Sequence, residues 1–539
     1  MNAIERFDEI AARQGAAAAV VWDERHRRRT LSFAGLGDWS RRLATLFTRS
    51  GLARGDAVIV VLPFGATFLA VTGALLRCGL TAVFLDPVRW REKLDVASSA
   101  SRVRGFVGTT TACALRWLVP ELRSIPHAFV DGRWPGARSL AEAASAPPQR
   151  QPAACDAGAA ALVSFTSGTS GTPKAAVRTH GVLVAMQRML EREVELRAGE
   201  VHLSMLPFAV LAELGAGATC VIPDGNLGRL ARLDVARLAA QIRTHGVEVV
   251  VASPTVAERL AAQAAGTAPF DSVRRVYIGG APVLPRLLDL WHRAAPAARI
   301  VIVYGMTEAE PIATLAGHEY GDGERRATRA GAGLLVGHPV KGAEVRIAAL
   351  PNRSPGSANP EFVAAGVEGE IVVGGPQVSP GYLGRPDVEG AGEVTGDGRR
   401  LRTGDAGYLD ARGRLWLTGR CRDGVALGTT TVHPLRVEAA LADDPAVARA
   451  AFLLWDHERV VAIQPYERGA QLPMERIAAC VAFAAPERVV VVDRIPVDAR
   501  HGAKVDYRRL AADLAAGRVR QWHRPAVGNA LPELPRASA

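Results

Sequence analysis

The stretch "SFTSGTSGTPKAAV", residues 164–177, alternates small hydroxyl side chains with glycines and closes on a Pro-Lys pair. These residues cannot pack a core, so the stretch predicts a loop that wraps a ligand. Glycines let backbone amides approach an anion, hydroxyls add donors, and the lysine adds a charge, which together suit phosphate. The residues expected to contribute are Thr166, Ser167, Gly168, Thr169, Ser170, Gly171, Thr172 and Lys174.

This loop differs from a Walker A loop, because Pro173 precedes the lysine and Ala175 follows it. The physical basis for binding phosphate is nevertheless similar. A flexible Ser/Gly loop that binds nothing is the alternative.

The surrounding chain predicts an α/β fold. The apolar runs at 247–254, 274–280 and 299–305 are continuous rather than alternating, which indicates strands covered on both faces. The uncharged segment Ala57 to Leu76 is about long enough to span a bilayer. Because Pro63 and Gly65 divide it, a buried strand, turn and helix is the preferred interpretation, and no transmembrane segment is expected.

The length of 539 residues exceeds what a single core supports, so two or more domains are expected. The 48% hydrophobic and 22% charged content is typical of a globular protein. Residues 146–158 and 350–362 are predicted to be a linker and a loop. After Arg420 the strands and helices become shorter, which predicts domains over 1–420 and 421–523. A loose tail is expected over 524–539.

The formal charge of +11 favours anionic ligands without naming one. The run His26 to Arg29 predicts the exposed tip of a hairpin, with a nucleic-acid patch as the alternative; no nucleic-acid partner is expected. The six cysteines show no metal-binding spacing, and the N-terminus has no apolar signal segment. A cytoplasmic protein with reduced thiols is the resulting prediction.

Three further stretches carry charged residues suited to a nucleotide. Glu308, in "VYGMTEAEP", follows a strand, where a carboxylate and phosphate oxygens would hold Mg²⁺. Asp405 could accept from ribose hydroxyls, and Arg420 offers a forked donor. Lys504 lies in a loop beside Gly502. A solvated glutamate, a charged hairpin and a surface lysine are the respective alternatives.

The order and spacing of these four stretches resemble the adenylate-forming superfamily of acyl-CoA synthetases, peptide-synthetase adenylation domains and firefly luciferase. The resemblance runs from about residue 10 to 515, and "GGAP" (279–282) and "GEIVVGGPQVSPGYLGRPD" (369–387) belong to it. It implies a large N-terminal domain with layered sheets and helices and a small, mobile α+β C-terminal lid. It also implies that ATP and a carboxylic acid react to acyl-adenylate and pyrophosphate.

The resemblance assigns roles by matching position. Residues 166–174 would hold the β- and γ-phosphates, and Thr307 and Glu308 would serve phosphate and Mg²⁺. Asp405 and Arg420 would hold the ribose. Lys504 would bridge the substrate carboxylate and the α-phosphate. The residues expected around adenine are Gly280, Ala281 and Tyr304, with Gly305 in the same nucleotide site.

The chain departs from the superfamily pattern after Arg420. Arg422 falls where most members have a hinge aspartate, and Ala426 where many have a lysine, which puts thioester formation in doubt. With "IPVDARHGAK" (495–504) and the stretch at 206–224, the altered hinge is similar to olefin-pathway β-lactone synthetases. That resemblance implies a β-hydroxy acid whose own hydroxyl displaces AMP and closes a lactone.

Ring closure requires a group that accepts the hydroxyl proton. Glu213, in "AVLAELGAGA", and His180, in "VRTHGVL", are the candidates, and a structural role is the alternative for each. The apolar, small-residue character of 206–223 predicts an aliphatic acyl chain.

Three other functions stay open. An acyl- or aryl-CoA ligase would use coenzyme A, which the lactone reaction does not need. A donor of acyl-adenylate to a carrier protein, or a member of a complex of pathway enzymes, would need a protein partner. A non-enzymatic binder of acyl-adenylate is the last alternative, against which Lys504, Glu308 and Asp405 argue. ATP and Mg²⁺ are the expected cofactors in the enzymatic cases.

Overall fold

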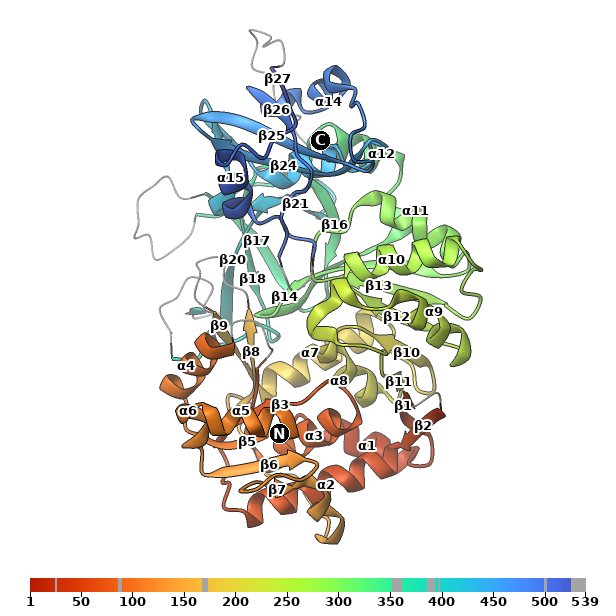
Figure 1. Ribbon diagram of the computed structural model, residues 1–539, viewed down its shortest axis with the longest axis vertical. Coiled ribbons are helices and arrows are strands. Elements are labelled where there is room, and N and C mark those ends of the chain that lie inside the picture. The colour runs from red at the N-terminus through yellow and green to blue at the C-terminus, as the bar shows by residue number, and fades with distance from the viewer. Residues whose placement is uncertain are drawn as a thin grey trace.

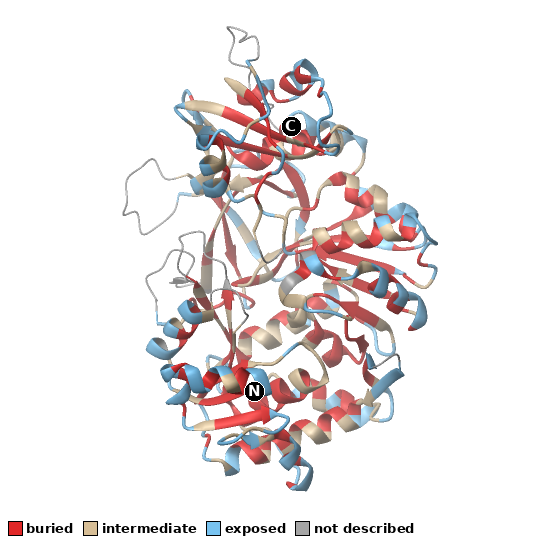
Figure 2. Cartoon of the chain, viewed as in Figure 1, coloured by how far each residue is buried: buried red, intermediate tan, exposed pale blue. Residues whose placement is uncertain are grey.

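The structure is a computed structural model, and it describes residues 1–24, 27–85, 90–166, 173–350, 361–384, 393–395, 398–498 and 502–524. Two large β-sheets with helices on their faces form the main body, and smaller sheets near the C-terminus lie at one end of it (Figure 1). The predicted α/β class is confirmed. Strands are mostly buried, and the outward faces of the helices are exposed (Figure 2).

One sheet has seven strands in the order β7-β6-β5-β3-β4-β8-β9. Its strands are β3 (Ala57–Val61), β4 (Thr81–Phe84), β5 (Val103–Thr109), β6 (His127–Asp131), β7 (Arg138–Ser139), β8 (Ala160–Thr166) and β9 (Lys174–Thr179). All pairs are parallel except β8 with β9, which form a hairpin. Strand β3 is followed by α3 (Ala66–Cys78), so the buried strand, turn and helix is confirmed. Within the described part of the chain, every helix is too short or too polar to span a bilayer.

The other sheet runs in the order β17-β18-β20-β21-β16-β15-β14-β13-β12-β10-β11-β1-β2, with β19 beside β20. The strands that carry the argument below are β10 (Val201–Ser204), β11 (Thr219–Val221), β12 (Val249–Ala252), β13 (Arg275–Gly279), β14 (Arg299–Met306) and β15 (Ala309–Ala316). The remaining strands are β1 (Ala18–Glu24), β2 (Arg27–Ser32), β16 (Leu334–Pro339), β17 (Glu344–Ala348), β18 (Gly369–Gly374), β19 (Glu393–Thr395), β20 (Gly398–Leu409) and β21 (Leu415–Arg420). Strands β10 to β14 are parallel neighbours, which confirms the three predicted apolar strands.

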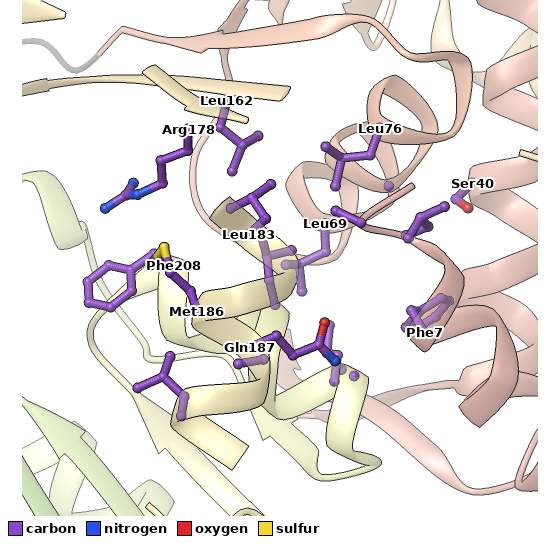
Figure 3. Close-up of a pocket in the computed structure, with 18 of the residues that line it drawn as sticks. Phe7, Ser40, Leu69, Leu76, Leu162, Arg178, Leu183, Met186, Gln187 and Phe208 are labelled. Atoms are coloured by element: carbon purple, nitrogen blue, oxygen red, sulfur yellow. The ribbon is translucent and has the colours of Figure 1, made fainter. Parts of the chain in front are cut away.

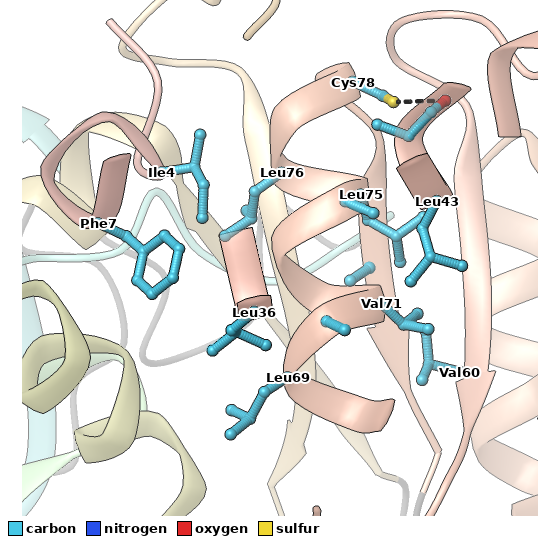
Figure 4. Close-up of a cluster of buried hydrophobic side chains, with 14 of the residues drawn as sticks. Ile4, Phe7, Leu36, Leu43, Val60, Leu69, Val71, Leu75, Leu76 and Cys78 are labelled. Carbon is cyan, nitrogen blue, oxygen red and sulfur yellow. Dashed lines mark hydrogen bonds between the residues drawn. The ribbon is translucent and has the colours of Figure 1, made fainter. Parts of the chain in front are cut away.

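The helices of the main body are amphipathic or buried according to their place. They are α1 (Glu5–Arg13), α2 (Phe33–Arg49), α4 (Trp90–Ala100), α5 (Thr110–Leu118), α6 (Pro120–Arg123), α7 (His180–Glu193), α8 (Pro207–Ala216), α9 (Val235–Thr244), α10 (Pro254–Ala265), α11 (Pro285–Ala294) and α12 (Asp322–Arg329). Figure 4 shows one core, in which Leu36 and Leu43 of α2 pack with Leu69 and Leu75 of α3. Burying such side chains contributes roughly 1.5–3 kcal/mol each.

The C-terminal part follows β21, which ends at Arg420. It contains the hairpin β22 (Val425–Leu427) and β23 (Thr430–Val432) and a sheet of β24 (Val447–Trp455), β25 (Glu458–Pro465), β26 (Arg488–Val491) and β27 (Gln521–His523). Its helices are α13 (Pro434–Ala440), α14 (Met474–Cys480) and α15 (Tyr507–Ala515). Arg286 of α11 donates to the Ala442 carbonyl oxygen at 3.1 Å, which joins the two parts. The boundary near 420 and the mobility of the lid stay predictions.

Smaller expectations also have outcomes. Strands β1 and β2 pair as a hairpin, and Arg27 to Arg29 are exposed as predicted but belong to strand β2 rather than to the tip, while His26 lies outside the described residues. All six cysteines are free thiols. Most of the loop predicted at 350–362 and nearly all of the tail lie outside the described residues.

Candidate active site

The predicted phosphate loop connects the two strands of a hairpin. Thr166 at the end of β8 pairs with Lys174 at the start of β9. The intervening Ser167, Gly168, Thr169, Ser170, Gly171 and Thr172 lie outside the described residues. Lys174 is half-buried, and its Nζ lies 5.1 Å from the centre of the Tyr382 ring, a cation–π contact.

Tyr382 links this lysine to the predicted magnesium ligand. Its hydroxyl donates to Oε1 of Glu308 at 2.6 Å, and Glu308 is buried directly after β14. Burial, together with the Glu308 carboxylate, raises the pKa of Tyr382, so the phenol stays a donor. Sequence reasoning quoted the stretch that contains Tyr382 but did not single the residue out.

A second cluster surrounds Asp405. Tyr304 of β14 donates its hydroxyl proton to Asp405 Oδ2 at 2.8 Å, and Arg420 Nε lies 3.0 Å from Asp405 Oδ1. Asp405 and Arg420 face each other across the β20–β21 ladder, so the pairing of the strands holds them together. The charge of Asp405 raises the pKa of Arg420, and burial and then Asp405 raise that of Tyr304.

The residues predicted around adenine lie at the ends of two neighbouring parallel strands. Gly280 and Ala281 come directly after β13, Tyr304 and Gly305 are near the end of β14, and Thr307 follows that strand. Gly280 has a φ of +85°, which favours glycine, and a Cβ there would meet no atom of the described residues within 4 Å. The open space beside this backbone suits a flat ring. The Lys174–Tyr382–Glu308 group and the Tyr304–Asp405–Arg420 group are together called the nucleotide corner below.

The predicted catalytic lysine belongs to the C-terminal part. Lys504 is exposed, and its backbone N–H donates to Asp498 Oδ1 at 2.9 Å in the loop between Val497 and Val505. Arg449 of β24 donates to the Ala503 carbonyl oxygen at 2.8 Å and so braces this loop. The role of Lys504 stays a prediction.

A largely apolar cavity, called the tyrosine cavity below, lies beside the ends of β13 and β14. Its empty volume is about 520 Å³. The lining residues are Leu190, Val194, Leu196, Leu206, Phe208, Ala209, Ala212, Glu213, Val251, Tyr277, Gly279, Val303 and Glu310. Gly279 precedes Gly280, and Val303 precedes Tyr304, so the cavity adjoins the nucleotide corner.

Glu213 is the predicted base that the structure brings to this cavity. It is buried on α8, and Ser204 donates to its Oε1 at 2.9 Å. His202 Nδ1 lies 3.5 Å from the same oxygen. Oε2 of Glu213 has no hydrogen-bond partner among the residues that the structure describes.

His180, the other predicted base, lies elsewhere. It is fully buried at the start of α7, and its Nδ1 accepts from the Ala3 N–H at 3.1 Å. Burial and the nearby N-terminal ammonium lower its pKa to about 4, so the ring is neutral. Since His180 lines neither cavity described here, the geometry favours its structural alternative.

Glu310 is a cavity residue that sequence reasoning missed. Its Oε2 lies 3.8 Å from Arg178 of β9, whose guanidinium stands over the Phe208 ring at 5.8 Å. Burial, partly offset by Arg178, raises the pKa of Glu310 to about 7. The only available signal was a second acid two positions after Glu308, which has no meaning without the fold.

A second apolar cavity, the helix cavity, lies between α1, α2, α3, α7 and α8 and has an empty volume of about 820 Å³. Figure 3 shows Arg178 and Phe208 at one end and Phe7 and Ser40 at the other. Leu190, Phe208 and Ala212 line both cavities, so the two share a wall.

The chain is similar to known proteins in sequence and in fold. The model of a family described as AMP-binding enzyme matches residues 7–383. The olefin beta-lactone synthetase of Stenotrophomonas maltophilia (strain K279a) is 31% identical over 534 residues, covering 94% of this chain and 95% of that protein. The olefin beta-lactone synthetase of Xanthomonas campestris pv. campestris is 32% identical and covers 96% of each chain.

Among solved structures, amide bond synthetase McbA from Marinactinospora thermotolerans has a TM-score of 0.78 at 24% identity, covering 95% of this chain and 99% of its own. ATP-bound MatB from Rhodopseudomonas palustris has a TM-score of 0.75 at 20% identity, covering 95% and 99%. At these identities the likeness concerns the fold.

Fold and site together define an adenylate-forming enzyme, which activates a carboxylic acid with ATP as its adenylate. The chain belongs to the family of AMP-binding enzymes.

Proposed function

We infer that this enzyme activates a β-hydroxy acid as its acyl-adenylate and then closes the acid to a β-lactone, releasing AMP. The names and coverage of the two relatives above 30% identity support this inference. The departures at Arg422 and Ala426 also support it, because ring closure needs no external thiol.

One observation carries the proposal: the tyrosine cavity, otherwise apolar, has two carboxylates, Glu213 and Glu310, in its wall. A plain aliphatic chain gains nothing from these groups, and burying them is costly. A hydroxylated acid has a polar group that a carboxylate can accept from.

The nucleotide corner supplies the first step. Asp405 and Arg420 would hold the ribose, and Lys174 and Lys504 would balance phosphate charge as it moves onto pyrophosphate. Glu308 fits Mg²⁺ in the usual way, as one carboxylate completed by phosphate oxygens. Bound Mg²⁺ would neutralise charge on the leaving pyrophosphate.

The second step is an internal displacement. The β-hydroxyl oxygen attacks the acyl carbon, the bond from that carbon to the phosphate oxygen breaks, and AMP leaves. The hydroxyl proton passes to Glu213. Holding the hydroxyl within about 3–3.5 Å of the acyl carbon is a near-attack geometry that binding can enforce.

The test is product analysis with ATP, Mg²⁺ and a long-chain 2-alkyl-3-hydroxy acid, with and without coenzyme A. Loss of water from the acid together with lactone ring signals in NMR, independent of coenzyme A, is the expected result. A thioester that forms only with coenzyme A would overturn the lactone proposal in favour of a ligase. Adenylate that accumulates until a carrier protein is added would point to a carrier-loading enzyme.

A further inference from the structure

A line of alternating charges runs behind the tyrosine cavity. Arg275 of β13 contacts the Glu200 carboxylate, and His202 Nε2 lies 3.5 Å from Glu200 Oε2. On its other side, His202 Nδ1 lies 3.5 Å from Glu213 Oε1. The exposed side-chain fraction is 16% for Glu200 but only 0% for His202 and 2% for Glu213, so the two inner groups are buried.

This line is poorly explained by stability. Buried ion pairs are often no more stable than apolar residues of similar size. Neither ring nitrogen of His202 has a hydrogen-bond partner of good geometry in the described ranges, and Oε2 of Glu213 has none either. Such incomplete satisfaction of buried charge is typical of functional sites.

We propose that His202 and Glu200 are positioning residues for Glu213 in ring closure. The charged His202 ring holds Glu213 as a carboxylate beside the acyl chain, and Glu200 stabilises the charge on His202. The inference rests on the proposed lactone function, since adenylation alone releases no hydroxyl proton.

The proton transfer balances without any further reactant. When the hydroxyl oxygen bonds to the acyl carbon, its proton goes to Glu213. His202 keeps both of its ring protons throughout, and Glu213 releases the accepted proton to solvent once the lactone and AMP have left. The resting state of the line is thereby restored, with Glu213 ionised and His202 protonated.

The groups that face His202 define the expected pH dependence. They are Glu213 from α8, Glu200 from the segment before β10, and Cys220 opposite His202 on β11, with Arg275 reaching Glu200. Burial raises the pKa of Cys220 well above its usual value, so this thiol stays neutral.

Burial alone would lower the pKa of His202, but Glu200 and Glu213 outweigh it and raise the pKa to about 8. Below that pH the ring is charged and stabilises the Glu213 carboxylate. Ring closure should therefore decline as the pH rises through about 8, whereas pyrophosphate exchange should not follow the same curve.

The experiment compares two readouts in each variant: ATP–pyrophosphate exchange for adenylation, and lactone formation in a single turnover across pH 6 to pH 9.5, roughly the range in which a perturbed histidine titrates. Glu200→Gln removes one carboxylate from His202 and should move the decline of lactone formation to lower pH by about one unit. His202→Gln should slow lactone formation by about 10²-fold and abolish the decline, with exchange within about threefold of wild type.

The matched control is Glu195→Gln. Glu195 Oε2 also approaches Arg275, at 4.0 Å, but it lies outside the line to His202. The Glu195→Gln variant should show the same pH dependence of lactone formation as the wild type. An unshifted decline in Glu200→Gln, or equal loss of exchange and lactone in His202→Gln, would overturn the proposal. If His202→Gln does not fold, the pH dependence of lactone formation in Glu200→Gln still tests the proposal. Wild-type enzyme that adenylates but forms no lactone instead refutes the proposed function.

Discussion

The nucleotide corner and the wall of the tyrosine cavity hold their charges in different ways. In the corner, Asp405 and Arg420 pair across neighbouring strands, and Glu308 accepts from Tyr382 at 2.6 Å. In the wall, Glu213 has one such bond, from Ser204, and otherwise lies 3.5 Å from His202. The corner is a set of firmly fixed groups suited to a ligand of constant shape. The wall keeps a buried carboxyl group with one oxygen that has no hydrogen-bond partner among the described residues, which suits proton transfer.

The largest expected effect concerns Lys504, which belongs to the C-terminal part and to neither of these two regions. Lys504→Ala should reduce ATP–pyrophosphate exchange by about 10²–10³-fold, because a charge that stabilises the transition state is removed. Lactone formation should fall with it. The control is Arg508→Ala, an exposed cation of the same part of the chain. Near-normal exchange in the Lys504 variant would show that its assigned role is wrong.

The next largest effect is expected for Glu213→Gln, which should affect lactone formation but not adenylation. Lactone formation should fall by about 10²-fold, since a general base is lost, while exchange should change by less than about threefold. Glu308→Gln is the matched comparison in the nucleotide corner and should reduce both reactions. If Glu213→Gln instead reduces lactone formation and exchange equally, Glu213 has a structural role, and the two regions do not differ in function.

Asp405→Asn tests the corner alone. Removing the charge that binds Arg420 and Tyr304 should raise the KM for ATP by about 10- to 100-fold, as expected for a charged hydrogen-bond acceptor. Tyr304→Phe keeps the ion pair and should raise that KM by only about fivefold. Steady-state kinetics with ATP varied at saturating acid measures both, and a larger effect in Tyr304→Phe would reverse the assignment.

A smaller effect concerns which cavity takes the acyl chain. Ala209→Leu should narrow the tyrosine cavity and lower kcat/KM for a long-chain acid by about tenfold relative to a short-chain acid. Leu183→Phe, in the helix cavity, is the matched variant and should leave that ratio near the wild-type value. The opposite pattern would place the chain in the helix cavity.

The smallest effect is on stability. The folded-state pKa of His180 is about 4, below its value of 6.5 in an unfolded chain, so its contribution to stability is present above pH 6.5 and lost as the pH falls toward 4. His180→Gln should show a shallower loss of unfolding free energy between pH 7 and pH 5, measured by urea denaturation. Parallel slopes for the variant and wild type would show that His180 titrates as an ordinary histidine.

The residues of the nucleotide corner could be predicted from the sequence, because they lie in short stretches whose order along the chain indicates the family. Thr307 and Glu308 follow a predicted strand, and Asp405 and Arg420 fall on two strands that a hairpin brings together. The sequence predicted fewer of the residues in and around the wall of the tyrosine cavity. Glu213 was found because an acid interrupts an apolar helix, but His202 and Glu310 had no comparable signal.

The amino-acid sequence by itself determined the α/β class, the strands near 249, 275 and 299, and the family, because continuous apolar runs and glycine-rich loops have local physical causes. Only the tertiary structure decided that His202 stands between Glu200 and Glu213, and that Glu310 faces the same cavity. The physical reason is that the environment of a buried charge depends on neighbouring strands and helices. Those neighbours are distant in sequence, and no local pattern encodes their approach.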